Sequence, residues 1–248
     1  MNEWFKNETF WRMTFPIMFD ASRLSGTKAE VDGFIKLASI KKTDSVLDLA
    51  CGAGRHLLEL NARGYSQLCG IDSSKYLLAQ ARQQAQKQGR LITFERADMR
   101  DFNKPKTYNV VLSLFSSFGY FNSELENVSV LKNIYTSLKT GGRLLLDVRG
   151  REHFISHFDE YSENNVHGIH VTAQREPLEN FHKIRNTWHL KTNGRTTSFI
   201  FSHWVYGQDE LVALCRQAGF KRIKTFGGFN GQPYSNDAKR LIVVAIKS

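Results

Sequence analysis

Residues 46–56 read VLDLACGAGRH, an apolar run that gives way to two glycines and then to a segment typical of a helix start. Gly52 and Gly54 lack a Cβ atom, so the backbone can turn sharply there and approach a bound ligand closely. Further along, a second apolar run ends at Asp72, whose carboxylate is suited to accept hydrogen bonds from both hydroxyls of a ribose. The two features together predict a cofactor that contains a nucleoside.

A glycine-rich turn followed by an acid also describes NAD enzymes, whose pattern is Gly-x-Gly-x-x-Gly. Leu57 stands where that pattern has its third glycine. Because that glycine lets the helix pack closely beside a pyrophosphate, its replacement weakens the dinucleotide interpretation without excluding it.

Three further features follow in order: FERADM at 94–99, an apolar run at 109–114, and LKTGGRLLLD at 138–147. As a set, over about residues 30–248, they resemble the class I S-adenosylmethionine-dependent methyltransferases. The resemblance implies S-adenosylmethionine as cofactor and an α/β, Rossmann-like, seven-stranded, mostly parallel sheet whose last strand is antiparallel. Alternating apolar runs and helical patterns between residues 45 and 147 independently favour a parallel sheet covered by helices on both faces.

The resemblance also implies roles for individual residues. The loop from Ala50 to Gly54 would wrap the methionine part of the cofactor, and Asp48 would help to hold its amino end. Asp72 would accept from the ribose and Asp98 from the adenine amino group. The rest of the predicted cofactor site is Gly52, Ser73, Met99 and Leu114. Two plainer interpretations remain open, with Asp72 as a strand-end cap and Asp98 as a turn residue.

The amino-acid composition indicates the broad class of protein. The 248 residues are 41% hydrophobic, enough for one large domain with a core. We expect a cytoplasmic protein, because no stretch has the length of a membrane span and the N-terminus lacks the apolar centre of a signal peptide. The three scattered cysteines suggest neither a disulfide framework nor a thiolate metal site, and Cys51 is interpreted as a packing residue rather than a nucleophile.

The net charge of +10 leaves nucleic acid open as a partner. No basic tail or arm concentrates that charge, so no motif supports such a partner. We therefore expect a small-molecule substrate, no membrane partner, and a monomer or homodimer.

The chain is predicted to be a single methyltransferase domain with four parts. These are an N-terminal cap segment and helix (1–40), a cofactor-binding core (41–149), an inserted antiparallel lid (150–206) and a C-terminal completion of the sheet (207–248). Within the lid, strands are predicted at 167–176, 181–191 and 196–206, and Asn193-Gly194 marks a hairpin turn between the last two. This layout resembles bacterial small-molecule methyltransferases with an added β-layer over the active site.

Periodicity and turn signals predict the remaining elements. Helices are expected at 28–39, 74–88, 123–138, 152–158 and 208–218, and the last two strands at 221–226 and 241–247. The aromatic residues before position 20 are explained equally well as a plug over the cofactor pocket and as core packing.

The catalytic residues are less clear from the sequence. If the acceptor must lose a proton, a histidine is the natural base, and His203 is our candidate because a strand places it beside aromatic residues. Phe118, Tyr120 and Arg149 are candidates for substrate binding, with core packing as the alternative for the two aromatics. His153 and His157 have a spacing compatible with two metal ligands, but no third ligand motif accompanies them, so no metal is expected.

Other functions stay open at this point. The segment after residue 113 lacks the Asp/Asn-Pro-Pro-aromatic sequence of many enzymes that methylate exocyclic amines of bases. The sequence favours a small-molecule methyltransferase, because a lid suits an enclosed pocket. An RNA or protein methyltransferase, and a binding module without turnover, are the alternatives.

Overall fold

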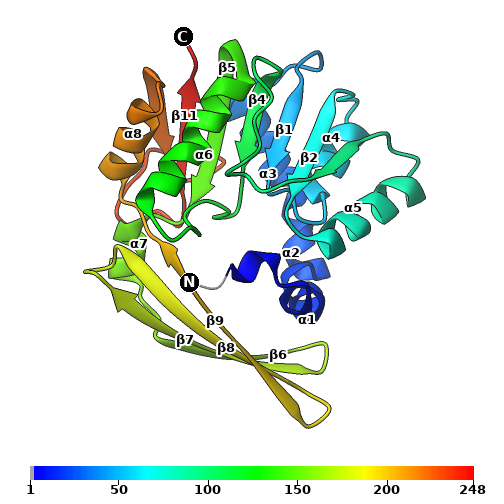
Figure 1. The fold of residues 1–248 in the computed structure, drawn as a ribbon, viewed down its shortest axis with the longest axis vertical. Coiled ribbons are helices and arrows are strands. Elements are labelled where there is room, and N and C mark those ends of the chain that lie inside the picture. Colours follow the sequence, from blue (N-terminus) through cyan, green and yellow to red (C-terminus); the bar gives the residue numbers. More distant parts are fainter. Residues whose placement is uncertain (1–2) are drawn as a thin grey trace.

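The computed structural model describes residues 3–248, and its centre is a seven-stranded sheet in the order β10-β11-β5-β4-β1-β2-β3 (Figure 1). β11 pairs antiparallel with both β5 and β10, whereas the other pairs are parallel. The Rossmann-like fold with an antiparallel last strand is thus confirmed. The strands are β1 (Val46–Leu49), β2 (Leu68–Asp72), β3 (Thr93–Arg96), β4 (Tyr108–Ser113), β5 (Leu138–Val148), β10 (Arg222–Phe226) and β11 (Leu241–Ile246).

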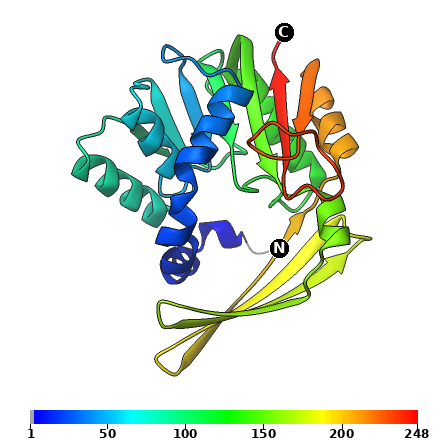
Figure 2. The ribbon, with the colours of Figure 1, turned by 180° about the vertical axis from the view of Figure 1, so that it is seen from behind.

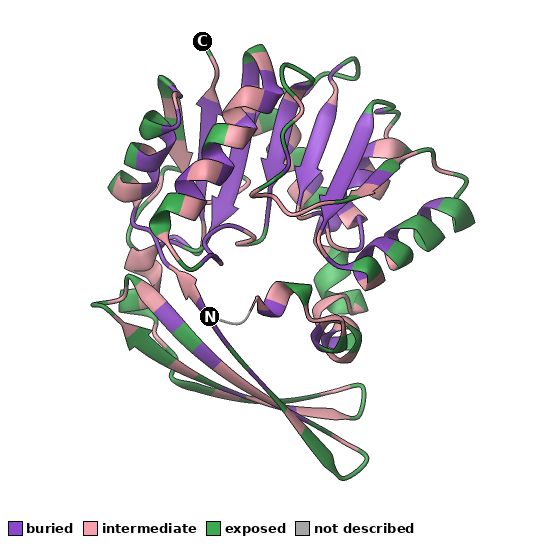
Figure 3. Cartoon of the chain, in the orientation of Figure 1, coloured by how far each residue is buried: buried purple, intermediate pink, exposed green. Residues whose placement is uncertain are grey.

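Helices cover both faces of this sheet. Side chains of α6 (Glu124–Ser137) and α8 (Gln208–Gln217) share one buried cluster with residues of β1, β4, β5 and β11. On the opposite face, α3 (Thr27–Leu37), α4 (Arg55–Ala62) and α5 (Lys75–Lys87) form a second cluster with the alternate residues of the same strands. β1 is therefore buried along its whole length, as expected for a central parallel strand (Figure 3).

Local signals fix where the helices begin. The Ser74 hydroxyl accepts from the main-chain N–H of Leu77 and caps α5. Ser123 and Glu126 form a capping box at the start of α6. These starts agree within a residue with the predictions from the sequence.

A separate four-stranded antiparallel sheet, in the order β6-β7-β8-β9, follows α7 (Arg151–Ser156) and precedes α8. Its strands are β6 (Tyr161–Val166), β7 (Ile169–Leu178), β8 (Lys183–Thr192) and β9 (Arg195–Trp204). Asn193 and Gly194 both have positive φ, 48° and 75°, and join β8 to β9 in the predicted hairpin. The sequence-based prediction of three strands was wrong, because it missed β6.

The N-terminal segment lies between the two sheets (Figures 1 and 2). It consists of η1 (Trp4–Lys6), α1 (Glu8–Met18) and α2 (Ala21–Ser25). Phe10 and Ile17 pack on Leu190, Phe199 and other apolar residues of the inner face of the lid. On its other side, the Glu8 carboxylate accepts from the N–H groups of Lys75 and Tyr76 and so ties α1 to the start of α5.

Among residues 3–248, the structure contains no helix with the length and apolar character required to cross a membrane.

Candidate active site

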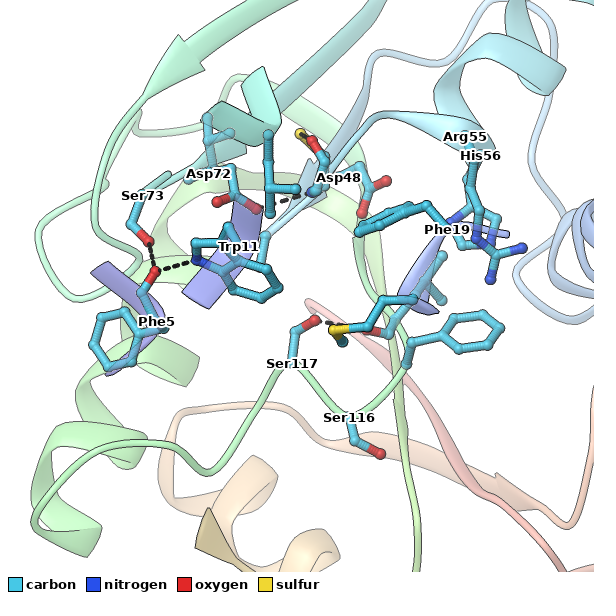
Figure 4. A pocket seen from close by; sticks show the side chains of 18 of the residues that line it. Phe5, Trp11, Phe19, Asp48, Arg55, His56, Asp72, Ser73, Ser116 and Ser117 are labelled. Carbon is cyan, nitrogen blue, oxygen red and sulfur yellow. Dashed lines mark hydrogen bonds between the residues drawn. The ribbon is translucent and has the colours of Figure 1, made fainter. Parts of the chain in front are cut away.

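A cavity of about 540 Å³ lies at the carboxyl ends of β1, β2 and β4. The order of the strands reverses between β4 and β1, and open α/β sheets bind ligands at such a switch point. The N-terminal segment closes the cavity from the side of the lid. Figure 4 shows Asp48 and Asp72 around this cavity together with Trp11 and Phe19.

The loop after β1 forms one wall of the cavity. Ala50 and Gly52 have φ values of 63° and 55°, and both line the wall. A Cβ on Gly52 would lie 3.2 Å from the ring of Phe19, and one on Gly54 would lie 3.0 Å from the ring of Phe94. Both glycines are thus required by positive φ and by close packing. Gly54 lies behind the wall rather than on it.

Asp48 lies in this wall at the carboxyl end of β1. It is 2% exposed, and its Oδ2 has no hydrogen-bond partner within residues 3–248. Burial raises the pKa of Asp48 to about 7, although the charge of Arg55 opposes the shift. A cationic ligand group would remove this cost, and the ammonium group of a methionine moiety is such a group.

Asp72 ends β2 beside the glycine loop. Its Oδ2 accepts from the N–H of Gly52 at 2.8 Å, and its Oδ1 accepts from the N–H of Ser74 at 2.9 Å. Burial raises the pKa of Asp72 despite these bonds. Each carboxylate oxygen keeps a second lone pair, so the residue can still accept from a diol. Its neighbour Ser73 also lines the cavity and donates to the carbonyl oxygen of Phe5 at 3.3 Å.

Asp98 and Met99 follow β3 and line the same cavity. The Asp98 carboxylate accepts from the main-chain N–H and the guanidinium of Arg100 and lies 3.0 Å from the Lys6 ammonium. Against the opposing effect of burial, these bonds hold the pKa of Asp98 at about 2. A carboxylate has roughly four acceptor positions, and these donors fill them. An adenine amino group would therefore have to replace one of them, so the assigned role stays a prediction.

The loop after β4 is strained. Phe115 and Ser116 have φ values of 56° and 57°, a conformation that bulky residues rarely adopt. The fully buried Asp147 holds this loop, because its Oδ2 accepts from the N–H of Phe115 at 2.8 Å and its main-chain oxygen from that of Ser116. The Arg240 guanidinium donates to the same Oδ2 at 2.5 Å and lies 4.2 Å from the centre of the Phe115 ring. Leu114, Phe115 and Ser116 thereby line the cavity.

Several lining residues were not assigned from the sequence, or were assigned only as one of two alternatives. Arg55 and His56 start α4 and contact Glu30 of α3, and all three line the cavity. The N-terminal segment adds a further set, namely Trp4, Phe5, Trp11, Met18, Phe19, Ser22, Arg23 and Ser25. The position of Arg55 beside Gly54 was a usable signal, whereas the N-terminal residues reach the site only through the way their segment folds back. Of the two explanations for the N-terminal aromatics, both hold, because Phe10 packs beneath the lid while Trp11 and Phe19 line the cavity.

The four residues predicted for the acceptor side are Tyr120, His203, Phe118 and Arg149, and the structure places them differently. Tyr120 lines the cavity, with burial raising its pKa to about 12. His203 is not among the lining residues, but its ring centre lies 5.6 Å from that of Tyr120. Burial and the charge of Arg149 lower the pKa of His203 to about 4, so the imidazole is neutral at physiological pH. Its role as a base stays a prediction.

For Phe118 the structure agrees with core packing, the alternative that the sequence left open. It is 2% exposed and packs in the core against Tyr206, at 5.6 Å between ring centres. Phe118 is not among the residues that line the cavity. Arg149 lies next to the lining residue Ser116, whose hydroxyl accepts from the main-chain N–H of Arg149 at 3.1 Å.

These features fit S-adenosylmethionine. The Asp48 carboxylate in the wall suits the amino end of its methionine moiety, the wall at Gly52 has no side chain, and Asp72 lines the same cavity from the end of β2.

Comparison with known proteins agrees with this fit. Residues 46–142 match the model of a methyltransferase domain family. A glycine/sarcosine N-methyltransferase of Halorhodospira halochloris is 26% identical over 226 residues, which cover 90% of this chain and 82% of that protein. A dTDP-3-amino-3,4,6-trideoxy-alpha-D-glucopyranose N,N-dimethyltransferase of Streptomyces venezuelae is 30% identical over 106 residues, 43% of each chain.

A solved structure extends the comparison to the fold. An S-adenosylmethionine-dependent methyltransferase from Clostridium acetobutylicum superposes with a TM-score of 0.78 at 11% identity, covering 97% of this chain and 98% of its own. At that identity the likeness shows the fold alone. Residues 46–142 thus match a methyltransferase domain, and the chain as a whole is similar in sequence and in fold to S-adenosylmethionine-dependent methyltransferases.

Proposed function

We propose that the protein transfers a methyl group from S-adenosylmethionine to a nitrogen atom of a small-molecule amine. The nitrogen acceptor is supported by the two related sequences, whose names describe N-methyltransferases of glycine and of an amino sugar. The small size of the acceptor is supported by the cavity, because about 540 Å³ must hold cofactor and acceptor together. The single observation that carries the proposal is one cavity that is lined by Asp48, Gly52 and Asp72 and also by Tyr120, so that it has room for cofactor and acceptor side by side.

The chain's main contribution to the reaction is positioning. S-adenosylmethionine, when bound, supplies an activated methyl group on a good leaving group. The walls after β1 and β4 hold the two reactants in one orientation, and the aromatic residues of the N-terminal segment keep water out of the cavity. Correct orientation alone lowers barriers by ~7–11 kcal/mol in favourable systems.

An ammonium acceptor must lose a proton before it can attack. We keep His203 as the proposed proton acceptor, because it is neutral and lies in ring contact with the lining residue Tyr120. A base with a pKa near 4 is weak, so we assign most of the rate to orientation rather than to proton transfer.

The proposed function is tested by supplying the protein with methyl-labelled S-adenosylmethionine and three classes of acceptor: small amines, total RNA and total protein. We expect label in glycine, sarcosine or nucleotide-linked amino sugars. Label confined to RNA or protein, or no transfer while the cofactor is bound, would contradict the proposal.

Gly52→Val is expected to weaken S-adenosylhomocysteine binding at least about tenfold, because the new side chain meets Phe19 and narrows the cavity. Calorimetric titration measures the effect. Gly89→Val is the matched control, since Gly89 has a similar φ of 61° with open space around its Cβ position. Equal losses in both variants would show that backbone strain, not the cavity, causes the effect.

The raised pKa of Asp48 predicts that cofactor binding depends on pH. Only the ionised carboxylate pairs with the ammonium group of the ligand, and burial raises the pKa of Asp48 to about 7 in the free protein. We therefore expect S-adenosylhomocysteine to bind about tenfold more weakly at pH 6 than at pH 8, with the affinity levelling off above the pKa. Calorimetry over this pH range should find no such change in Asp48→Asn. A wild-type affinity independent of pH would remove Asp48 from the site.

We also propose that the protein works in the cytoplasm as a monomer or homodimer. The three buried free thiols, Cys51, Cys69 and Cys215, support a reducing compartment.

A further inference from the structure

The N-terminal segment is held over the cavity by polar contacts with the core and by apolar contacts with the lid. The polar contacts reach the segments that follow β2 and β3. Ser73 donates to the main-chain oxygen of Phe5 (Figure 4), and the Glu8 carboxylate accepts from the N–H groups at the start of α5. The apolar contacts join η1 and α1 to the inner face of the lid. Eight residues of this segment line the cavity, so its position determines how far the cavity is closed.

One polar contact of this segment uses a residue of the cavity wall. The Lys6 ammonium lies 3.0 Å from Oδ2 of Asp98, and Asp98 lines the cavity whereas Lys6 does not. The Arg100 guanidinium donates to both oxygens of the same carboxylate, at 3.1 and 2.7 Å, and the main-chain N–H of Arg100 donates to Oδ1 at 3.0 Å. Lys6 and Arg100 together thus fill the roughly four acceptor positions of this carboxylate.

Of the two donors, Lys6 is the one that can leave more easily. Arg100 makes three hydrogen bonds to Asp98 and also pairs with Glu126 at 2.8 Å. Lys6 makes a single contact with Asp98, and its side chain is 39% exposed. Its ammonium also lies 2.8 Å from the Glu3 carboxylate. When Lys6 moves away from Asp98, its charge therefore stays paired with Glu3 and hydrated by solvent.

We propose that the Lys6–Asp98 ion pair is an autoinhibitory contact that competes with the cofactor. The Asp98 carboxylate accepts from the adenine amino group of S-adenosylmethionine only after Lys6 has left it. Because Lys6 belongs to η1, this exchange also releases one of the contacts that hold the N-terminal segment over the cavity. The inference rests on the proposed function, since it concerns the cofactor of the same cavity.

Lys6→Met is expected to strengthen the binding of S-adenosylhomocysteine about threefold, because it removes a partly exposed ion pair that competes with the ligand. Calorimetric titration of the full-length protein measures the dissociation constant. Arg12→Met is the matched control, since Arg12 is an exposed cation of the same segment that lies over the Tyr76 ring and does not line the cavity. It should bind the ligand like the wild type. Unchanged or weaker binding in Lys6→Met would overturn the proposal.

A modified ligand tests whether the competition is for the adenine amino group. An analogue of S-adenosylhomocysteine in which a hydrogen atom replaces this amino group cannot donate to Asp98. Lys6→Met should therefore bind the analogue with the same affinity as the wild type. A gain as large as that for S-adenosylhomocysteine would show that Lys6 acts in another way and would contradict the proposal.

A double-mutant cycle tests whether the effect passes through Asp98. In an Asp98→Asn background the ion pair with Lys6 is already lost, so the added Lys6→Met change should leave the affinity for S-adenosylhomocysteine unaltered. A threefold gain that persists in this background rules out the proposed competition. Failure of the wild type to bind S-adenosylhomocysteine would instead contradict the proposed function.

Discussion

Asp72→Ala is expected to weaken S-adenosylhomocysteine binding by at least about tenfold. The substitution removes the acceptor proposed for the ribose, and it leaves the N–H groups of Gly52 and Ser74 without their present partner. The loss of a buried charged hydrogen-bond acceptor costs about 1–3 kcal/mol, and about 1.4 kcal/mol corresponds to a tenfold change in affinity. Calorimetric titration of the purified variant measures the effect directly.

Two variants control this experiment. Asp72→Asn keeps the size of the side chain and one acceptor oxygen, so it should lose less affinity than Asp72→Ala. Asp101→Ala removes an exposed acid near the same end of the sheet and should bind the ligand like the wild type. Unchanged binding in Asp72→Ala would show that this carboxylate does not contact the cofactor.

Asp147→Ala is expected to reduce the free energy of unfolding by about 3 kcal/mol. The change leaves the Arg240 guanidinium and the N–H of Phe115 without their buried acceptor. Removal of one partner of a buried ion pair costs about 3–5 kcal/mol, and the 28% exposure of the Arg240 side chain places the effect at the low end. The midpoint of urea unfolding measures the loss.

Two further variants, one of them in the strained loop after β4, control this prediction. Asp147→Asn keeps an acceptor for the N–H of Phe115 and should lose less stability than Asp147→Ala. Phe115→Gly, added to Asp147→Ala, should recover part of the loss because glycine adopts a φ of 56° without strain. An Asp147→Ala variant as stable as the wild type would show that the Asp147–Arg240 pair does not support this loop.

The central sheet was predictable because its strands and helices carry strong local patterns. The buried run of β1, the capping serines of α5 and α6, and the apolar run of β11 each determine their own element. β6 was missed for the opposite reason. Its sequence, YSENNV, is mostly polar and exposed, and only its pairing with β7 makes it a strand.

The candidate site likewise contains residues that local patterns predict and residues that they do not. Asp48, Gly52 and Asp72 were predictable because the ends of adjacent parallel strands meet at one edge of the sheet. For Trp11 and Phe19 the sequence left a plug over the cavity and core packing as equal alternatives, because their positions depend on packing between the two sheets and on the contact of Glu8 with α5. The position of Phe118 in the core involves its packing against Tyr206, a residue distant in the sequence that no local pattern identifies as its partner.

The most direct test of the account is a crystal structure of the protein with S-adenosylhomocysteine. We predict that the ribose hydroxyls lie within hydrogen-bond distance of Asp72, that the amino group of the ligand lies near Asp48, and that its thioether sulfur faces the loop after β4. Electron density that places the ligand outside this cavity, or its ribose away from Asp72, would contradict the account.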